Sequence, residues 1–494
     1  MKVCVLQADY GNSSVDYKNY DPARYLDHLL PEAEVHHAFL NKISTYRQIQ
    51  DLSHQKFDIY VNLCEGYLEW DIPSIDVIHT LELLNLPYTG PTSKLYDPPK
   101  DLMKYVSYCC GIKTPLYYKL TDLKQVSEVL EQINFPMFVK PLKAGDSLGI
   151  DHNSRCTTKE DLELKLSCLI KEYDEILVEE CIDGREFTVL VAANPQKEGE
   201  CTSFTPVEYI FPEGFSFKTY SLKTSELHPE SNKACDDLEL ELGLRDAAER
   251  IFKAFQGVGY GRMDFRVNEN REIYFLEINF TCSVFYTKGY EGSADYILQF
   301  DGIGQEGFLK LIIEEGIARH QRKQKLYESK GNSISGFGIY ATKDVKKGQV
   351  IFKGEERSQR FVTKRHVKRH WEPEDKRYFA QYAYPISDQV YCLWDENPTE
   401  WAPQNHCCTP NTHYDGLNVV ASKSIKRGEE LTLDYATFLD ETAESFKCNC
   451  KSPECKKVVK GMKGNSVSVR EQALIKPRVK KDDSRVEEVV SDKR

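Results

Sequence analysis

Residues 260–280 read YGRMDFRVNENREIYFLEINF, two runs of alternating apolar and polar residues joined by a polar turn. Alternation with a period of two predicts a pair of antiparallel strands. In such a hairpin Asp264, Glu277 and Asn279 come to corresponding ends, on one face. Two carboxylates and an amide oxygen are hard ligands, suited to Mg²⁺ shared with nucleotide phosphates. A cross-strand polar pair on an ordinary hairpin is the alternative interpretation.

A second segment, upstream of the hairpin, carries a lysine at the end of a predicted strand. Residues 135–141 read FPMFVKP, which places Lys140 there, and a small-residue loop, AGDSLGI, follows at 144–150. Backbone N–H groups of such a loop can approach phosphate oxygens closely, and a nearby lysine neutralises them. A strand, a turn and another strand without any ligand is again the alternative. The order of both segments along the chain favours a nucleotide site.

Strands and helices alternate before these segments, which predicts a parallel α/β layer. Val3–Leu6 and Phe57–Leu63 are predicted to be buried strands, and 72–85 has the spacing of a helix. A strand at 86–91 ends in turn residues. Further helices are expected at 102–110, 160–171, 238–255 and 307–319, with strand-rich stretches at 135–150, 176–193, 204–211 and 260–280.

Residues 58–319 resemble the D-alanine–D-alanine ligase branch of the ATP-grasp superfamily. The motifs stand in the family's order, and together they are specific. They are LELLNLPYTG at 81–90, FVKP at 138–141, GDSLG at 145–149, LVEECIDGREFTV at 177–189, and the pairs Arg262/Asp264 and Glu277/Asn279.

The resemblance implies an ATP site and a mechanism. A carboxylate is activated as an acyl phosphate and then attacked by an amine, since phosphate is a good leaving group; positioning and charge neutralisation do most of the catalysis. The residues carried over are Lys100, Lys140, Ser147 and Lys223 for the phosphates, Glu179, Cys181 and Ile182 for the adenine hinge, Glu186 for the ribose, Asp264, Glu277 and Asn279 for Mg²⁺, and Arg262 for the oxyanion of the tetrahedral intermediate.

Three segments depart from the family's pattern. NLCEGYLE at 62–69 replaces the His-Gly and Glu-Asp-Gly sequences, and NFTCS at 279–283 replaces Asn-x-x-Pro-Gly. VFYTK at 284–288 stands where the family holds the acceptor's carboxylate with a small hydroxyl residue. Substrate-contacting positions have changed while nucleotide-contacting ones have not. We therefore expect an active ligase whose substrate is not D-alanine.

Near the C-terminus, residues 448–455 read CNCKSPEC. Three thiolates this close need one more soft ligand for a tetrahedral structural Zn²⁺ site, and the stretch NHCCTPN at 405–411 supplies candidates. Three free surface cysteines are the alternative. The other cysteines of the sixteen are mostly scattered singly, as in a reduced intracellular protein.

Residues 327–461 resemble a SET domain with its post-SET cysteine segment, on the motifs GFG at 336–338, NHCCTPN at 405–411 and ELTLDY at 430–435. The resemblance implies a methyltransferase in which Tyr435 orients a lysine-like amine for in-line attack on the sulfonium methyl. Leu433 stands where many relatives have an aromatic residue, which leaves the degree of methylation open. The implied ligands are Gly336, Phe337, Gly338, Asn405, His406 and Tyr435 for S-adenosylmethionine, and Cys408, Cys448, Cys450 and Cys455 for Zn²⁺.

These readings predict an α/β ligase, with a pre-ATP-grasp parallel sheet and α+β ATP-grasp subdomains, followed by a β-rich SET domain. With 494 residues the chain is too long for one core. The expected divisions are 1–95 (pre-ATP-grasp), 96–320 (ATP-grasp), 321–330 (linker), 331–440 (SET), 441–462 (post-SET zinc segment) and 463–494 (charged, disordered tail).

Composition limits the partners. The net charge of -12 argues against a general nucleic-acid binder, although a local basic patch is compatible with it. Without a signal peptide or an apolar run long enough for a bilayer, we expect a cytoplasmic or nuclear protein with no membrane. The expected substrates are amino-acid-like carboxylates and amines and a lysine-containing protein, and a homodimer is compatible with the ligase resemblance.

Two functional hypotheses remain open, besides a purely structural role. The first is a bifunctional enzyme that uses ATP, Mg²⁺, S-adenosylmethionine and Zn²⁺, joining a carboxylate to an amine and methylating a lysine-like amine. The second is a protein-lysine methyltransferase whose ligase-like domain only binds a nucleotide or a partner. Asp264, Glu277 and Asn279 favour the first hypothesis, since a binding-only domain need not keep them together.

Overall fold

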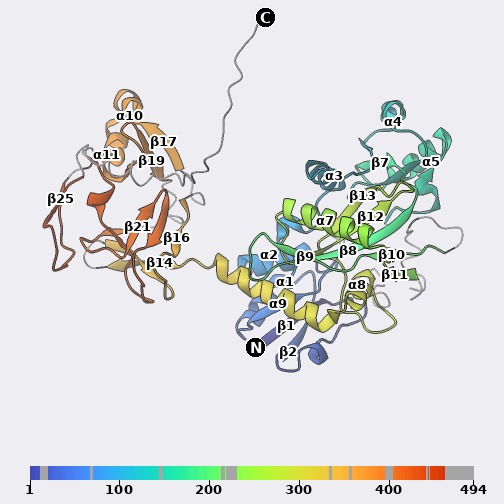
Figure 1. Cartoon of the computed structure of the whole chain (residues 1–494), viewed down its shortest axis with the longest axis horizontal. Helices are drawn as coiled ribbons and strands as arrows, with labels where there is room; N and C mark the ends of the chain where they lie inside the picture. The colour runs from blue at the N-terminus through green and yellow to red at the C-terminus, as the bar shows by residue number, and fades with distance from the viewer. Residues whose placement is uncertain are drawn as a thin grey trace, which may run out of the picture. The chain divides into compact units, whose positions relative to one another are not determined.

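The computed structural model divides into two compact units, Met1–Lys323 and Gln324–Arg494 (Figure 1). It describes all residues except 12–20, 67–70, 144–147, 213–216, 218–230, 333–335, 355–358, 395–403, 441–442, 444 and 462–494. The predicted tail at 463–494 therefore lies outside the described residues. Among those that are described, no helix combines the length and the apolar character that crossing a bilayer requires.

The first unit begins with a parallel sheet of order β2-β1-β3. Its strands are β1 (Lys2–Ala8), β2 (Glu34–Leu40) and β3 (Ile59–Asn62). Helix α2 (Ile75–Leu83) packs on one face of this sheet together with α1 (Thr45–Ser53), and α9 (Gly304–Lys323) packs on the other. The apolar runs of β1 and β3 follow from this, because both faces are covered.

Of the strand predicted at 86–91, only Tyr88 pairs, as a parallel bridge to Tyr60. Tight turn geometry leaves no room for more, since Asn85 and Gly90 both adopt positive φ angles. The remainder of the predicted parallel α/β layer is confirmed.

Two antiparallel sheets complete the first unit (Figure 1). The smaller has the order β4-β7-β5-β6, with β4 (Tyr117–Leu120), β7 (Ile176–Glu180), β5 (Met137–Pro141) and β6 (Arg155–Cys156). The larger has the order β11-β10-β8-β12-β13, with β11 (Asn232–Ala234), β10 (Val207–Tyr209), β8 (Arg185–Ala193), β12 (Tyr260–Val267) and β13 (Ile273–Asn279); β9 (Cys201–Ser203) pairs with β8.

Helices cover the apolar faces of these sheets. The core of the larger sheet packs against α7 (Leu238–Ala254) on one side, while α8 (Ser293–Asp301) and α9 lie on the other. The smaller sheet packs against α4 (Val126–Gln132) and α5 (Lys159–Leu169). Helix α3 (Lys100–Cys109) contacts β13. The apolar periodicity of 160–171 and 238–255 thus reports faces that are buried on sheets.

The second unit is β-rich, as predicted. Its sheets are small: β14-β15, β16-β22-β21, β17-β19-β18, the parallel pair β20-β23, and β24-β25. The strands are β14 (Tyr327–Asn332), β15 (Gly336–Ala341), β16 (Val350–Phe352), β17 (Gln359–Thr363), β18 (Tyr384–Pro385), β19 (Val390–Trp394), β20 (Asn405–His406), β21 (Thr412–Asp415), β22 (Asn418–Ala421), β23 (Thr432–Leu433), β24 (Phe446–Lys447) and β25 (Val458–Val459). Two helices, α10 (Lys364–His370) and α11 (Pro373–Tyr382), flank β17 and β19.

Helix α9 extends beyond its predicted end at Arg319 as far as Lys323, and β14 begins at Tyr327. The stretch 321–330, expected to be a linker, therefore consists of the last helical turn, a short connection and the first residues of a strand.

Candidate functional sites

In the first unit, a pocket lies between the two antiparallel sheets. The smaller sheet contributes Lys140 from β5 and Glu179 and Glu180 from β7, and the larger contributes residues from β8, β12 and β13. Cys181–Asp183, which cross from β7 to β8, close one side. The pocket also includes Pro115, Phe138, Ile150, Ile182, Glu186, Phe217, Asp264, Arg266, Leu276 and Glu277.

Three buried lysines surround carboxylates at the floor of this pocket. Lys140 Nζ lies 2.6 Å from Glu179 Oε1, and Lys104 Nζ lies 2.7 Å from Glu179 Oε2. Lys100 Nζ is 3.7 Å from Glu277 Oε2. Burial lowers the pKa of Lys104 to about 8 and also lowers that of Lys100. Burial opposes the charge on Glu179, but Lys104 and Lys140 outweigh it and bring its pKa to about 2.

This arrangement fixes the side chain of Glu179, which lines the pocket, and its place in the adenine hinge stays a prediction. The sequence placed it in the adenine hinge, whereas its side chain is held in the structure by two lysines from α3 and β5. Of the other hinge residues, Cys181 and Ile182 line the pocket. Ser147 and Lys223, expected to contact phosphate, lie outside the described residues.

The β12–β13 hairpin brings the predicted Mg²⁺ ligands together. Asp264 lies directly across from Glu277, and a bulge follows after Asp264. Asn279 lies across from Arg262, whose Nη2 is 3.4 Å from Asp264 Oδ2. The Asn279 side-chain oxygen accepts a hydrogen bond from the Thr281 N–H at 2.8 Å. Two carboxylates and an amide oxygen on neighbouring strands, beside buried lysines, fit Mg²⁺ together with a polyphosphate.

Glu186, predicted to hold a ribose, lines the pocket next to Arg266. The two are cross-strand partners on β8 and β12, and Arg266 Nη2 lies 2.9 Å from Glu186 Oε2. Arg266 Nη1 also donates to the Gly184 carbonyl oxygen at 2.9 Å, which fixes the guanidinium. Arg266 therefore orients the Glu186 carboxylate at the edge of the pocket.

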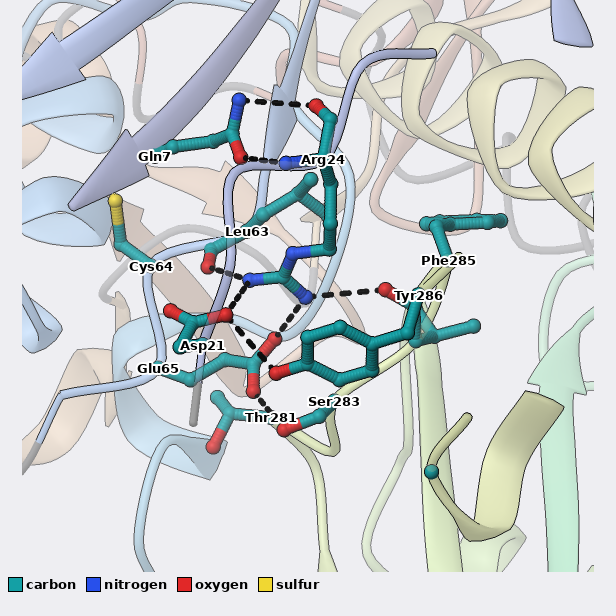
Figure 2. A network of polar contacts seen from close by, with 12 residues as sticks. Gln7, Asp21, Arg24, Leu63, Cys64, Glu65, Thr281, Ser283, Phe285 and Tyr286 are labelled. Atoms are coloured by element: carbon teal, nitrogen blue, oxygen red, sulfur yellow. Dashed lines mark hydrogen bonds and ion pairs between the residues drawn. The ribbon is translucent and has the colours of Figure 1, made fainter. Parts of the chain in front are cut away.

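The segments that depart from the family's pattern meet around one buried side chain, Arg24 (Figure 2). Its Nη1 donates to Glu65 Oε1 and to the Val284 carbonyl, each at 3.0 Å. Its Nη2 donates to the Leu63 carbonyl at 3.0 Å and lies 3.1 Å from Asp21 Oδ1.

Hydroxyl groups complete this network. The Tyr286 hydroxyl donates to Asp21 Oδ1 at 2.9 Å, and Ser283 Oγ donates to Glu65 (Figure 2). The Arg24 guanidinium stacks on the Tyr286 ring, with its Cζ atom 4.7 Å from the ring centroid. Burial raises the pKa of Glu65 to about 7, with Arg24 acting in the opposite direction. Glu65 follows β3, beyond the carboxyl end of the parallel sheet, where ligands of open α/β sheets bind.

In the second unit, the motifs at 405–411 and 430–435 are joined by hydrogen bonds. β20 and β23 pair in parallel, and Asn411 accepts from the Thr432 N–H and donates to the Glu430 carbonyl. Asn405 Nδ2 donates to the Phe337 carbonyl at 2.9 Å, so it connects β15 to this core. The predicted S-adenosylmethionine contacts Gly336–Gly338 and Asn405 are thus brought together.

The side chain of His406 faces inward. Its Nδ1 accepts from the Tyr435 N–H at 3.1 Å, and its Nε2 lies 3.3 Å from Cys408 Sγ. Burial lowers the pKa of His406. The imidazole thus connects the segment of the predicted catalytic tyrosine to the cysteine cluster.

Tyr435 lies among aromatic rings. The centroids of Phe438, Phe446 and His406 are 5.4, 5.8 and 5.5 Å from its ring. Its hydroxyl donates to the Gln404 carbonyl, and burial raises its pKa to about 12. Because that hydroxyl has one hydrogen and two lone pairs, its oxygen can still accept from an amine N–H.

Cys408, Cys448, Cys450 and Cys455 form the predicted metal cluster. Their sulfur atoms all lie within 4.8 Å of one another, and Cys408 Sγ is 3.8 Å from Cys448 Sγ. Zn–S bonds of about 2.3 Å in a tetrahedron require sulfurs about 3.8 Å apart. The Lys456 N–H donates to Cys408 Sγ at 3.3 Å, which suits a thiolate. The four sulfurs therefore fit Zn²⁺.

Several positioning residues escaped the sequence reasoning. Lys104 carries a signal, since it is one helical turn after Lys100 on α3. Arg266 also carries a signal in the sequence, because it is two positions after Asp264 and four after Arg262 and so shares their face of β12. Lys456, whose Nζ lies 2.6 Å from Asp434 Oδ2, carries none, because its partner is far away in the sequence. Arg24 is close to Asp21 along the chain, but its other acceptors, at residues 63, 65 and 284, are far away.

Two protein families match this chain. Residues 111–286 match the model "D-ala D-ala ligase C-terminus", and residues 336–436 match the model "SET domain". The chain thus contains a D-Ala–D-Ala ligase-like ATP-grasp region followed by a SET domain.

Individual proteins similar to the first unit are also D-alanine–D-alanine ligases or a related ligase. A D-alanine–D-alanine ligase of Lactococcus lactis is 30% identical over 211 residues, 40% of this chain and 57% of that protein. One of Legionella pneumophila is 28% identical over 262 residues, covering 50% and 69%. The chain spans about 57% of the length of the Lactococcus relative. The crystal structure of the VanG D-Ala:D-Ser ligase from Enterococcus faecalis has a similar fold, with a TM-score of 0.50 at 19% identity over 64% of this chain and 99% of that one.

Replacing Lys104 should destabilise the first unit and weaken ATP binding. Lys104→Met leaves Glu179 buried with one lysine instead of two, which costs about 3 kcal/mol for a broken buried ion pair. Lys119→Met removes a half-exposed lysine that pairs with Glu175 at 2.9 Å, and costs less than about 1 kcal/mol. Urea unfolding and calorimetric titration with ATP measure both. Equal stability of the two variants contradicts the proposed role of Lys104.

Removing one sulfur of the cluster should release zinc. We expect one zinc per chain by elemental mass spectrometry, lost in Cys450→Ser together with a lower melting temperature, because a structural zinc site contributes folding energy. Cys407→Ser alters a neighbouring cysteine outside the cluster and should retain the metal. Zinc retained in both variants contradicts the site.

Proposed function

We propose that this chain, which joins a D-Ala–D-Ala ligase-like ATP-grasp region to a SET domain, is a bifunctional enzyme. Its first unit is an ADP-forming ligase that joins an amino-acid-like carboxylate to an amine. Its second unit transfers a methyl group from S-adenosylmethionine to a lysine-like amine. The observation that carries the ligase proposal is the placement of Asp264, Glu277 and Asn279 on one hairpin beside buried Lys100 and Lys140.

The proposed ligase reaction is the one that the family resemblance implies, and this charge distribution suits it. The substrate carboxylate attacks the γ-phosphorus of ATP, and ADP leaves with an acyl phosphate formed. The amine then attacks the carbonyl carbon, the C–N bond forms, and phosphate and a proton leave. Lys100 and Lys140 hold the phosphates, and Arg262 stabilises the oxyanion. The hairpin residues Asp264, Glu277 and Asn279 would hold Mg²⁺, which would neutralise phosphate charge.

The network around Arg24 supports a substrate different from D-alanine. Its guanidinium donates to four acceptors of this chain, from three separate segments, and Glu65 and Tyr286 surround it. Arg24 itself is buried, but Glu65, whose side chain is 18% exposed, leaves an acidic surface beyond the carboxyl end of β3. A polar side chain on the substrate suits this surface better than a methyl group.

In the second unit, the amine attacks the methyl carbon, the S–CH₃ bond breaks, and S-adenosylhomocysteine and a proton leave. Tyr435 would orient the amine, since its hydroxyl hydrogen is used by the Gln404 carbonyl while its lone pairs point elsewhere. Phe438, Phe446 and His406 pack around the tyrosine and exclude water. The four cysteines would hold Zn²⁺, which would support the fold.

The second hypothesis, a methyltransferase whose ligase-like region only binds, also has an observation in its favour. Arg262 and Asp264 lie 3.4 Å apart, and Lys140 is paired with Glu179, so the charges of the pocket partly compensate one another. Measurement of ADP release discriminates between the two hypotheses.

Asp264→Asn should abolish ADP release while ATP binding persists. The change removes one charge of the predicted Mg²⁺ site, and we expect turnover to fall at least about 100-fold, as for loss of a preorganised electrostatic group. The assay uses Mg-ATP with a panel of amino acids and amines, with products identified by mass spectrometry. Asp246→Asn, an exposed residue on α7, is the matched control and should keep full activity. Wild-type turnover that Asp264→Asn leaves unchanged contradicts the ligase proposal, and so does ATP binding without turnover on any panel.

Tyr435→Phe should reduce methyl transfer from labelled S-adenosylmethionine by at least about 100-fold, because the amine loses its orienting acceptor. Tyr378→Phe removes a hydroxyl on α11, 3.5 Å from the Trp394 carbonyl, and should leave the rate unchanged. Equal rates for both variants, with lysine peptides or with the ligase product as acceptor, argue against the role of Tyr435.

A further inference from the structure

Helix α10 is a strongly basic surface element. It reads KRHVKRH, with four Lys or Arg residues, two His and no acidic residue. Val367 is buried and anchors the helix, while Arg365, Lys368 and Arg369 are exposed. Just before the helix, Arg360 stacks on the ring of Trp371, 4.6 Å from its centroid. We call Arg365, Lys368 and Arg369 the α10 cations.

The α10 cations have no acidic partner among the residues that the structure describes. Within the part of the protein that the structure describes, none of them forms an ion pair, in contrast to Lys364 at the start of the same helix. The whole chain has a net charge of -12. Three unpaired cations on two helical turns of an acidic protein form a local surface that attracts negative charge.

The helix is attached to the segment of Tyr435. Lys364 Nζ lies 3.2 Å from Asp440 Oδ2, and the Tyr391 hydroxyl of β19 donates to the same carboxylate. The neighbouring Leu439 N–H donates to the Tyr435 carbonyl at 3.0 Å. One turn of chain therefore connects the proposed catalytic tyrosine to the start of α10.

The same β-sheet contributes to the aromatic surroundings of Tyr435. β17, which leads into α10, pairs with β19, and β19 pairs with β18. On β18, Tyr384 packs against Tyr414 and Phe438, with centroids 4.7 and 5.8 Å away, and Phe438 packs on Tyr435. The sheet that carries the basic helix therefore contacts the aromatic residues around Tyr435.

We propose that the α10 cations bind acidic residues that flank the methylated lysine of a protein substrate. This inference rests on the methyltransferase part of the proposed function and specifies its substrate class. Carboxylates of an acceptor chain would pair with Arg365, Lys368 and Arg369 while the lysine enters beside Tyr435.

The size of the surface favours an acidic peptide over a nucleic acid. Seven helical residues span about 10 Å, which corresponds to about three residues of extended chain. A protein that binds nucleic acid through its backbone can make about six to ten phosphate contacts, more than α10 offers. The few cations of α10 suit two or three carboxylates next to a lysine.

The test uses the full-length protein and two fluorescent 15-residue peptides with a central lysine, one flanked by glutamates and the other by glutamines. Fluorescence anisotropy measures Kd at low and high salt, and methyl transfer is followed with labelled S-adenosylmethionine. Arg365→Glu/Arg369→Glu reverses two of the α10 cations. Lys346→Glu/Lys347→Glu makes the same change at exposed lysines of the turn between β15 and β16.

We expect salt-sensitive, preferential binding of the glutamate peptide, weakened about tenfold in the α10 variant, the size expected for the loss of a few exposed charge pairs. The lysine-pair variant should bind it normally, and the preference in kcat/KM for the glutamate peptide should fall by the same factor only in the α10 variant. Equal binding of both peptides, or an unaffected α10 variant, overturns the proposal. So does an oligonucleotide that displaces the peptide and binds more tightly at α10.

The two proposals fail in different ways. If wild-type protein methylates glutamine and glutamate peptides equally and loses this activity in Tyr435→Phe, the methyltransferase stands and the acidic preference is wrong. If the glutamate peptide binds at α10 and no peptide or protein is ever methylated, the methyltransferase proposal is wrong, and with it the role of α10 in acceptor recognition.

Discussion

The first unit depends on one buried carboxylate. Glu179 lies between Lys104 of α3 and Lys140 of β5, at 2.7 and 2.6 Å, with almost no exposure to water. Burial of three charged groups is unfavourable unless they compensate one another, so helix and sheet must keep these positions. The same arrangement leaves the pocket between the two sheets lined by fixed cations and carboxylates. Preorganised charge of this kind is what phosphoryl transfer requires.

The second unit relies on a comparable connection of distant segments. His406 accepts from the backbone of Tyr435 and lies against Cys408, while Lys456, from the segment after the last cysteine, pairs with Asp434 at 2.6 Å. The metal cluster and the tyrosine segment therefore share partners. Loss of metal should disturb the methyl-transfer site as well as the fold, because small sheets alone bury little apolar surface. In both units, ion pairs between distant segments fix the positions of the candidate site residues: Glu179 with two lysines in the first unit, and Lys456 with Asp434 in the second.

In the first unit, the segments that match the family's motifs and the segments that depart from them lie in different places. The hairpin of β12 and β13 and the lysines of α3 and β5 surround the nucleotide pocket, whereas residues 62–65 and 283–286 meet at Arg24 (Figure 2). Altered segments at Arg24 beside a pocket that keeps the family's nucleotide motifs fit the proposed ligase with a substrate other than D-alanine. The proposed SET-domain activity also concerns an amine, and the α10 cations are the basis of the proposed charge selection of its acceptor.

Local patterns in the sequence determined the two fold classes, the hairpin with Asp264 opposite Glu277, and the spacing of Cys448, Cys450 and Cys455. These could be predicted because strand alternation and ligand spacing act over a few residues. The tertiary structure alone decided that Glu179 is held between two lysines, that Arg24 joins residues 63 and 284, and that α10 is tied to Asp440. Such contacts connect residues separated by tens to hundreds of positions. Their energies depend on burial and geometry, which arise only when the sheets and helices pack.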